Sequence, residues 1–409
     1  MVFKQRRFTV DLGPISERIQ KETIYYMKQQ PVILFLPVTY EDAMNEEVIG
    51  NIINVVRELQ EKHKCFKQII FGLDTADTKA KFNQAYKKFK VIPKSIVIWN
   101  NSPEMIKLIE GISESLRCVL PPGKGRNMWL GLGYRFATNR GSAYVLHDCD
   151  ILPEYYNKST LLSLIAPIVH PELDFGFSKA YYHRLTKKNG QQVLSGRVTR
   201  LLVGPLVDAL RKTYGFNREV RQYLNSLQSF NYPLSGEFAI KGNLADILRV
   251  QADWGLEVGT LNFLYDQQCS VAQVDLGTYD HKHSDISPDD PKKGLNKMSE
   301  EVAKTILRKI YSIIGRVLMD EKRFSQLLYD YDKYGERYVK SYRAVSANMG
   351  WSYDHIKELE RIRIFKGAIK RAYEIFKQNP EEIRPLFHWD EIDTRFRERL
   401  RKIVEKYNP

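Results

Sequence analysis

The first 150 residues alternate between short apolar runs and longer segments in which apolar positions recur every three or four residues. Short apolar runs predict buried strands, and the longer spacing predicts helices that bury one face. This alternation is typical of a parallel sheet with helical crossovers, so we predict an α/β fold. The first strand is expected to stop at Pro37. The predicted strands are residues 31–36, 68–73, 95–99 and 143–147, and the predicted helices are residues 15–28, 45–62, 78–89, 103–111 and one starting near Met128.

After residue 150 the pattern becomes mixed. From about residue 299 the chain is predicted to be helical almost to its end, and a cluster of turn formers at residues 284–291 gives the clearest boundary. The predicted strands here are residues 173–182, 232–240 and 272–276, with helices at residues 201–214 and 255–266.

Composition narrows the possible classes. The chain has 409 residues, of which 43% are hydrophobic, enough for one large domain or two ordinary ones. No apolar stretch could span a membrane and no secretory signal follows the N-terminus, so a soluble, cytoplasmic protein is expected. The four cysteines are scattered without a C-x-x-C spacing, which suggests neither a zinc site nor a disulfide framework. The net charge of +14 favours anionic partners, and because recognition motifs for nucleic acid are not apparent, no nucleic-acid partner is expected.

Two carboxylates, Asp148 and Asp150, follow the fourth predicted strand. Hard oxygen ligands suit Mg²⁺ or Mn²⁺, which commonly bridge substrate phosphates. Ligands of such sheets bind beyond the carboxyl ends of the strands, so residues 37–41 and 74–75 are expected on the same surface. The pair therefore predicts a metal site that holds a nucleotide diphosphate, with a solvated loop as the alternative.

Two basic, glycine-containing segments could bind anions. In residues 121–127 the glycines, Lys124 and a following helix N-terminus favour an anion, although the spacing is not that of a Walker loop. Further on, Gly196, Arg197 and Thr199 could grip a phosphate or a carboxylate. The alternative for residues 121–127 is an ordinary basic turn. The alternative for the Gly196 segment is a helix cap with arginines that face solvent.

Two acids and two histidines complete the candidate chemistry. Glu237 lies beside a flexible glycine and Glu257 near the start of an apolar helix, and sugar hydroxyls are natural partners for both. His281 and His283 are spaced to bind a metal, with a solvated pair as the alternative. Combined with the acidic pair, His281 becomes a candidate third metal ligand.

Eight motifs occur along the chain in the same order as in a known family, which the chain resembles. They are LPVTYE, LDT, PPGKGRNMW, HDCD, SGRVTRLLVGPLVDAL, YPLSGEFAI, WGLEVGTL and QVDLGTYDHKH. The chain resembles the retaining GT-A glycosyltransferases from about residue 32 to 308, above all the glucosyl-3-phosphoglycerate synthases and the related mannosyl-3-phosphoglycerate synthases. The resemblance implies a Rossmann-like GT-A sheet, mostly parallel, with a C-terminal helical extension.

The implied organisation has three parts. An N-terminal helical extension covers residues 1–30, and the catalytic domain covers residues 31–285, with a nucleotide-binding half at 31–150 and an acceptor-binding half at 151–285. Residues 286–409 form a C-terminal helical region. We interpret this region as a packing and dimerisation element, so a homodimer is expected, and a membrane-surface face is the alternative.

The implied reaction moves glucose from UDP-glucose to 3-phosphoglycerate with Mg²⁺ or Mn²⁺, giving a precursor of glucosylglycerate. The alternatives are a GDP-mannose donor, a free glycerate acceptor, or a non-catalytic binding protein on the same scaffold. Because no residue stands out as a nucleophile, we favour a front-face route in which the acceptor hydroxyl enters on the side that the diphosphate leaves.

The resemblance also implies roles for individual residues. The family commonly has asparagine where His283 stands, and extra residues in the first loop would let Glu46 replace Glu41. The donor would be bound by Pro37, Val38, Glu41, Asp74, Thr75, Lys124, Asp148, Glu237 and Glu257, the acceptor by Gly196, Arg197, Thr199 and His283, and the metal by Asp150 and His281, with Glu237, Asp148 and Lys124 as catalytic residues.

Overall fold

The protein is built around a nine-stranded sheet. A computed structural model describes residues 9–138, 141–280, 294–380 and 384–409. The strand order is β1-β9-β6-β8-β5-β2-β3-β4, with β7 paired to β6. Strand β8 is antiparallel to both of its neighbours and β7 to β6, whereas the other pairs are parallel, so the predicted mostly parallel α/β sheet is confirmed. The strands are β1 Val10–Leu12, β2 Val32–Thr39, β3 Phe66–Asp74, β4 Ser95–Trp99, β5 Ala143–Leu146, β6 Phe177–Lys188, β7 Gln191–Leu194, β8 Phe238–Lys241 and β9 Val271–Tyr279.

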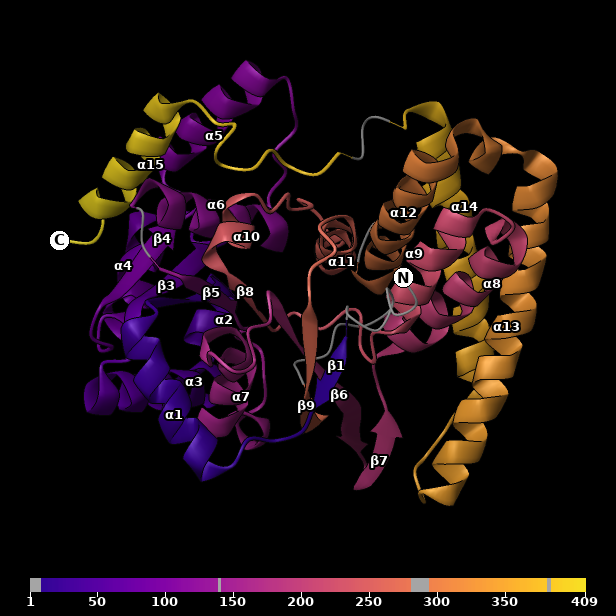
Figure 1. Cartoon of the computed structure of the whole chain (residues 1–409), viewed down its shortest axis with the longest axis horizontal. Coiled ribbons are helices and arrows are strands. Elements are labelled where there is room, and N and C mark those ends of the chain that lie inside the picture. The colour runs from indigo at the N-terminus through magenta and orange to yellow at the C-terminus, as the bar shows by residue number, and fades with distance from the viewer. Residues whose placement is uncertain (1–8, 139–140, 281–293, 381–383) are drawn as a thin grey trace.

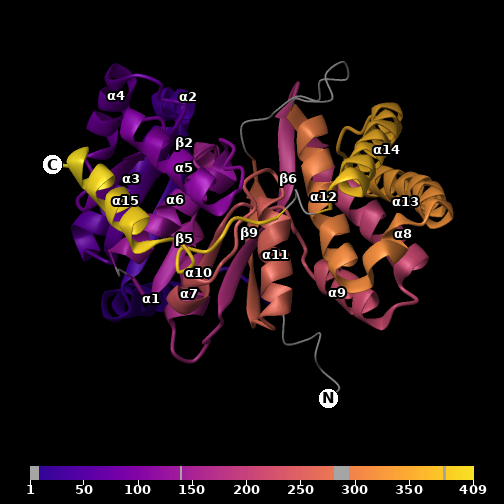
Figure 2. The ribbon, with the colours of Figure 1, turned by 90° about the horizontal axis from the view of Figure 1, so that it is seen from above.

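The helices fall into two groups on either side of β6 and β9 (Figure 1, Figure 2). Helices α1 to α7 and α15 surround strands β2 to β5, while α8, α9 and α12 to α14 gather on the other side. The helices are α1 Glu17–Gln29, α2 Tyr40–Met44, α3 Glu46–His63, α4 Lys79–Phe89, α5 Pro103–Leu116, α6 Lys124–Ala137, α7 Lys158–Val169, α8 Gly204–Tyr214, α9 Arg218–Gln228, α10 Gly242–Asp246, α11 Leu256–Asp266, α12 Gly294–Ile314, α13 Glu321–Asn348, α14 His355–Gln378 and α15 Thr394–Lys406.

Three predicted strands have wrong boundaries, and a proline explains two of them. Strand β2 continues past Pro37, which pairs with Gly72 of β3 and lies beyond the last residue that pairs with β5, so its missing N–H is tolerated. Strand β8 starts only at Phe238, because Pro233 and a turn from Tyr232 to Ser235 interrupt the expected run. Strand β6 begins at Phe177 and extends to Lys188, further than expected.

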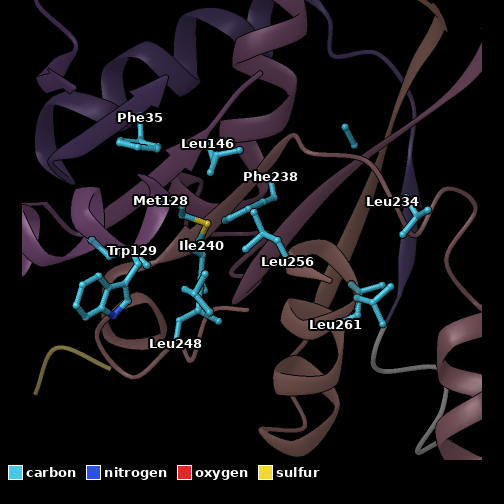
Figure 3. Packing of buried hydrophobic residues seen from close by; sticks show 14 of the residues in the cluster. Phe35, Met128, Trp129, Leu146, Leu234, Phe238, Ile240, Leu248, Leu256 and Leu261 are labelled. Carbon is cyan, nitrogen blue, oxygen red and sulfur yellow. The ribbon is translucent and has the colours of Figure 1, made fainter. Parts of the chain in front are cut away.

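Helix α6 begins at Lys124, four residues before the predicted start at Met128. Its buried face packs against β2 and β3 of the sheet, and Met128 lies near Leu146 and the β8 side chains Phe238 and Ile240 (Figure 3). All of these side chains are almost completely buried, and this burial stabilises the position of the helix. Lys124 is therefore the first residue of a helix that is anchored on the core.

The two ends of the chain both return to the sheet. Near the N-terminus, β1 pairs in parallel with β9, and α1 packs on α7. Near the C-terminus, the segment after α14 crosses back to the first helical group, where α15 packs on α5 and α6 (Figure 1). Among the described residues, no helix is long and apolar enough to cross a membrane.

Candidate active site

A large cavity opens where the carboxyl ends of β2, β3 and β5 meet. Its volume is about 540 Å³, and it lies where parallel sheets commonly bind ligands. Six of the predicted donor-binding residues line it, together with the predicted metal ligand Asp150. These residues are Pro37, Val38, Asp74, Thr75, Lys124, Asp148 and Asp150.

A smaller cavity of about 170 Å³ adjoins the first. The predicted acceptor residues Gly196, Arg197 and Thr199 line it, and so does Glu257. Its lining shares four residues with that of the large cavity, which makes the two cavities neighbours across a common wall. The shared residues are Lys124, Asp148, Asp150 and Trp254.

The common wall is organised by the Lys124 ammonium. Its Nζ lies 2.7 Å from Oδ1 of Asp148 and 3.1 Å from Oε1 of Glu257, so one cation bridges carboxylates from two distant segments. Burial alone would lower the pKa of Lys124, but the charges of Asp148, Glu257 and Glu237, with the hydrogen bond to Asp148, raise it above its ordinary value. The lysine is therefore positively charged at any physiological pH.

The close approach of these groups requires Gly236. A Cβ at this position would lie 2.1 Å from Oδ2 of Asp148 and 2.5 Å from Nζ of Lys124, so any side chain would collide with the bridge. The glycine next to Glu237 thus serves a packing role in the wall of the smaller cavity.

Glu237 lies behind this wall. Its side chain is completely buried, and Oε2 accepts a hydrogen bond of 3.1 Å from the Tyr182 hydroxyl. Within the described part of the chain, Glu237 is absent from the lining of both cavities, whereas Glu257 lines the smaller one. Oε2 of Glu257 is buried without a hydrogen-bond partner among the described residues, as expected for a group that meets a ligand.

The first loop places a different acid at the cavity from the two expected. Glu41 is exposed in the first turn of α2 and Glu46 is ion-paired with Lys88, and neither is among the described lining residues. Asp42 lines the large cavity instead, and its Oδ2 accepts a 2.6 Å hydrogen bond from the Thr39 hydroxyl. The helical turn therefore directs Asp42, rather than Glu41, to the cavity.

One side of the smaller cavity is cationic. Arg184 of β6 and Arg197 both line it. The Thr199 hydroxyl oxygen and the Arg184 Nε are buried there without hydrogen-bond partners among the described residues. Buried donors normally have partners, so this side of the cavity suits an anion with several oxygen acceptors.

The predicted metal site is described only in part. Asp148 and Asp150 line both cavities, and two carboxylates supply the oxygen donors that Mg²⁺ or Mn²⁺ prefers. His281 and His283 lie outside the described residues. Within the described residues alone, no group of three or more candidate ligands comes together.

Several lining residues were missed by the sequence analysis. Arg184 lies in a strand whose sequence pattern does not distinguish it. Tyr182 and Tyr232, which line the same cavity, come from two different segments of the chain. Trp254 stands in the WGLEVG motif and could have been singled out with Glu257. The missed residues that line a cavity include Asp42, Asn101, Tyr182, Arg184, Tyr232, Trp254 and Met298.

Comparison with solved structures supports the fold. A crystal structure of glucosyl-3-phosphoglycerate synthase from Mycobacterium tuberculosis, in complex with Mn²⁺, UDP-glucose and phosphoglyceric acid, has a TM-score of 0.51 and 22% identity to this chain, covering 74% of this chain and 86% of that one. The sheet and the cavities at its strand ends thus define the structural class of the protein: the chain has a GT-A fold.

Comparison with curated proteins identifies the family. Glucosyl-3-phosphoglycerate synthase from Persephonella marina is 34% identical over 394 residues, covering 95% of this chain and 92% of the relative. The enzyme of the same name from Methanococcoides burtonii is 28% identical over 382 residues, covering 92% of this chain and 88% of the relative. A scan against protein-family models gives no match. The chain belongs to the glucosyl-3-phosphoglycerate synthase family.

Proposed function

We propose that the protein transfers glucose from UDP-glucose to 3-phosphoglycerate and releases UDP and glucosyl-3-phosphoglycerate. The observation that carries this proposal is the common wall of the two cavities. Lys124, Asp148 and Asp150 line both the large cavity, which has room for a nucleotide, and the smaller, cationic one, and this arrangement supports the proposal. The names of the relatives, which cover nearly the whole chain, support the same reaction.

The donor would occupy the large cavity. The uridine would lie against Pro37 and Val38, with Asp42, Asp74 and Thr75 as polar partners. Its diphosphate would reach Lys124 at the common wall, where a fixed cation stabilises the charge that develops on the leaving group. Asp148 would contact ribose or sugar, and the free oxygen of Glu257 would accept a hydrogen bond from a glucosyl hydroxyl.

The acceptor would occupy the smaller cavity. A phosphoglycerate carries a phosphate and a carboxylate, which match Arg184, Arg197 and the Thr199 hydroxyl. We propose Arg184 as an acceptor-binding residue in addition to those expected from the motif. Glu237 would act from behind the wall, by helping to keep Lys124 charged.

Asp150 would hold a divalent metal, and we retain His281 as its proposed partner. When bound, Mg²⁺ or Mn²⁺ supplies Lewis acidity and neutralises charge on the diphosphate. The role of His283 beside the acceptor is likewise retained as a proposal.

The anomeric configuration would be retained through a front-face route. A double displacement needs a carboxylate nucleophile. Glu237 is buried behind the wall, and Asp148 and Glu257 are both bound to Lys124. The incoming hydroxyl would therefore attack from the side on which the diphosphate leaves. Mass-spectrometric detection of a glucosyl ester on any of these three acids would contradict this route.

The test is a panel of donors and acceptors, with and without Mg²⁺ or Mn²⁺, and NMR of the product. We expect the highest kcat/KM with UDP-glucose and 3-phosphoglycerate, and an α-linked product. Preference for GDP-mannose or for free glycerate would reassign the substrate, and the absence of any nucleotide-sugar binding by calorimetry would point to a non-catalytic protein.

We also propose that the enzyme is a cytoplasmic homodimer joined through the turn between α13 and α14. Val345, Met349 and Ile356 are exposed apolar side chains around this turn, which supports an interface. Sedimentation equilibrium should give twice the chain mass, and Met349→Glu should shift the protein toward the monomer. A monomeric wild-type protein would contradict the proposal.

A further inference from the structure

The acceptor loop, residues 194–203, is held in an unusual conformation. Gly196 has φ +66°, and a Cβ there would lie 2.8 Å from the Tyr232 hydroxyl. The segment Val198–Val203 that follows is a π-helix, a rare conformation that is frequently found at functional sites. This loop carries Arg197 and Thr199, so its conformation determines where two acceptor-binding groups point.

A buried arginine within the loop fixes its first turn. Arg200 is 8% exposed, and its Nε donates a 2.7 Å hydrogen bond to the carbonyl of Ser195. Its Nη2 donates a second, of 3.3 Å, to the carbonyl of Leu194. Ser195 in turn donates its N–H to the carbonyl of Arg184 at 2.9 Å, which connects the loop to the other cationic residue of the cavity.

The C-terminal helices hold this arginine. Nη1 of Arg200 lies 2.8 Å from Oε2 of Glu358 in α14, and the guanidinium stacks 4.8 Å from the ring centre of Tyr342 in α13. Glu358 is 3% exposed and also pairs with Arg361. Breaking the pair between Arg200 and Glu358 is costly, because the buried guanidinium of Arg200 would lose this carboxylate partner.

Two further hydrogen bonds join the same helices to the loop and its approach. The backbone N–H of Ser352, between α13 and α14, donates to the carbonyl of Gln192 at 2.9 Å. The buried hydroxyl of Tyr331 in α13 donates to the carbonyl of Leu201 at 2.7 Å. The C-terminal helices therefore contact the chain before, within and after the first turn of the loop.

We propose that Glu358 and Arg200 are positioning residues for the acceptor. Glu358 on α14 holds Arg200, and Arg200 holds the backbone that aims Arg197 and Thr199 at the phosphate and carboxylate of the acceptor. The C-terminal helices thus tune acceptor recognition from outside the GT-A sheet. This inference rests on the proposed function.

The test compares Glu358→Gln with Glu360→Gln, which changes an exposed glutamate of the same helix. We expect Glu358→Gln to raise KM for 3-phosphoglycerate about tenfold or more, while KM for UDP-glucose changes by less than about twofold. Calorimetric titration with UDP and Mn²⁺ should show unchanged donor binding, and Glu360→Gln should behave as wild type. Equal effects on both substrates, or none on the acceptor, would overturn the proposal.

A second variant tests the same contact in case Glu358→Gln does not fold. Tyr342→Leu removes the ring that covers Arg200 but leaves its ion pair, and Tyr329→Leu is the matched control on α13, because Tyr329 is 53% exposed. A selective rise in the acceptor KM of Tyr342→Leu supports the inference, and an unchanged acceptor KM overturns it. If the wild-type enzyme did not transfer glucose to 3-phosphoglycerate at all, the proposed function would fail instead.

Discussion

Lys124 lines both cavities and holds together the wall between them. Its ammonium bridges Asp148 and Glu257, which lie 24 and 133 positions away in sequence, so a single side chain connects the strand end to the acceptor side. Gly236 makes room for this bridge. The proposed transfer therefore depends on the position of the Lys124 charge.

We predict that Lys124→Met lowers kcat by about 100- to 1,000-fold, because it removes a preorganised cation from the leaving-group side. Steady-state kinetics with UDP-glucose and 3-phosphoglycerate measure the effect, and thermal unfolding checks that the variant is folded. Lys297→Met is the control, since Lys297 lines the same large cavity but is half exposed. A loss of similar size in the control would contradict the assignment.

A second lysine makes stability depend on pH. Lys179 is 2% exposed and donates from Nζ to the carbonyl of Ser235 at 2.7 Å. Burial lowers its pKa to about 8 although nearby Glu257 and Glu237 oppose this. Between pH 8 and the ordinary lysine pKa, the unfolded chain binds more protons than the folded one, so this group's contribution to stability rises with pH.

We therefore predict that the free energy of unfolding of the wild type, relative to Lys179→Met, increases above pH 8 by up to about 1.4 kcal/mol per pH unit. Urea unfolding of both proteins at pH 7, 8, 9 and 9.5 measures the difference, in which the other titrating groups cancel. Two parallel stability curves would show that the pKa of Lys179 is not lowered.

At the scale of elements, helix α6 joins the C-terminal segment to the site. Trp389 donates its indole N–H to the carbonyl of Trp129 at 2.7 Å, and Trp129 donates to the carbonyl of Phe387 at 2.8 Å. The two rings lie 4.3 Å apart, and Gly133 leaves space for Trp389. The segment before α15 thus packs on the same helix that begins at Lys124.

We predict that Trp389→Ala destabilises the protein by about 3–5 kcal/mol, since it removes a buried aromatic side chain and its hydrogen bond. Urea unfolding provides the measurement. Trp254→Ala, which truncates a tryptophan that is 45% exposed, should change stability much less. Equal losses of stability in the two variants would argue against the packing role of Trp389.

At the scale of the whole molecule, ligand binding should stabilise the fold. UDP with Mg²⁺ or Mn²⁺ would bind the folded chain but not the unfolded one. Such binding raises the free energy of unfolding by about 2.7 kcal/mol when the ligand is at 100 times its Kd. We predict a clear rise in Tm that EDTA removes.

Asp150→Ala should lose the metal-dependent part of this rise, whereas Asp390→Ala, at an exposed site, should keep it. A metal-dependent rise in Asp150→Ala equal to that of the wild type would reject Asp150 as a ligand.

The sequence determined the alternation of strands and helices, and therefore the parallel sheet, because burial of apolar residues with a fixed period is a local property. It also located the polar residues that follow the strands, because the end of each apolar run can be read from the chain. It did not determine that Asp42 rather than Glu41 faces the cavity, or that α6 starts at Lys124, because local turn geometry decides both.

Only the tertiary structure brought together the groups that are distant in sequence. Arg184 joined the acceptor side because β6 extends beyond its predicted end, and Glu358 reached Arg200 from 158 positions away because α14 packs against the acceptor loop. Contacts of this kind depend on how whole elements pack, and no periodicity in the chain encodes them. The sequence thus specified the catalytic scaffold and its motifs, and the packing of the C-terminal helices decided how the acceptor loop is held.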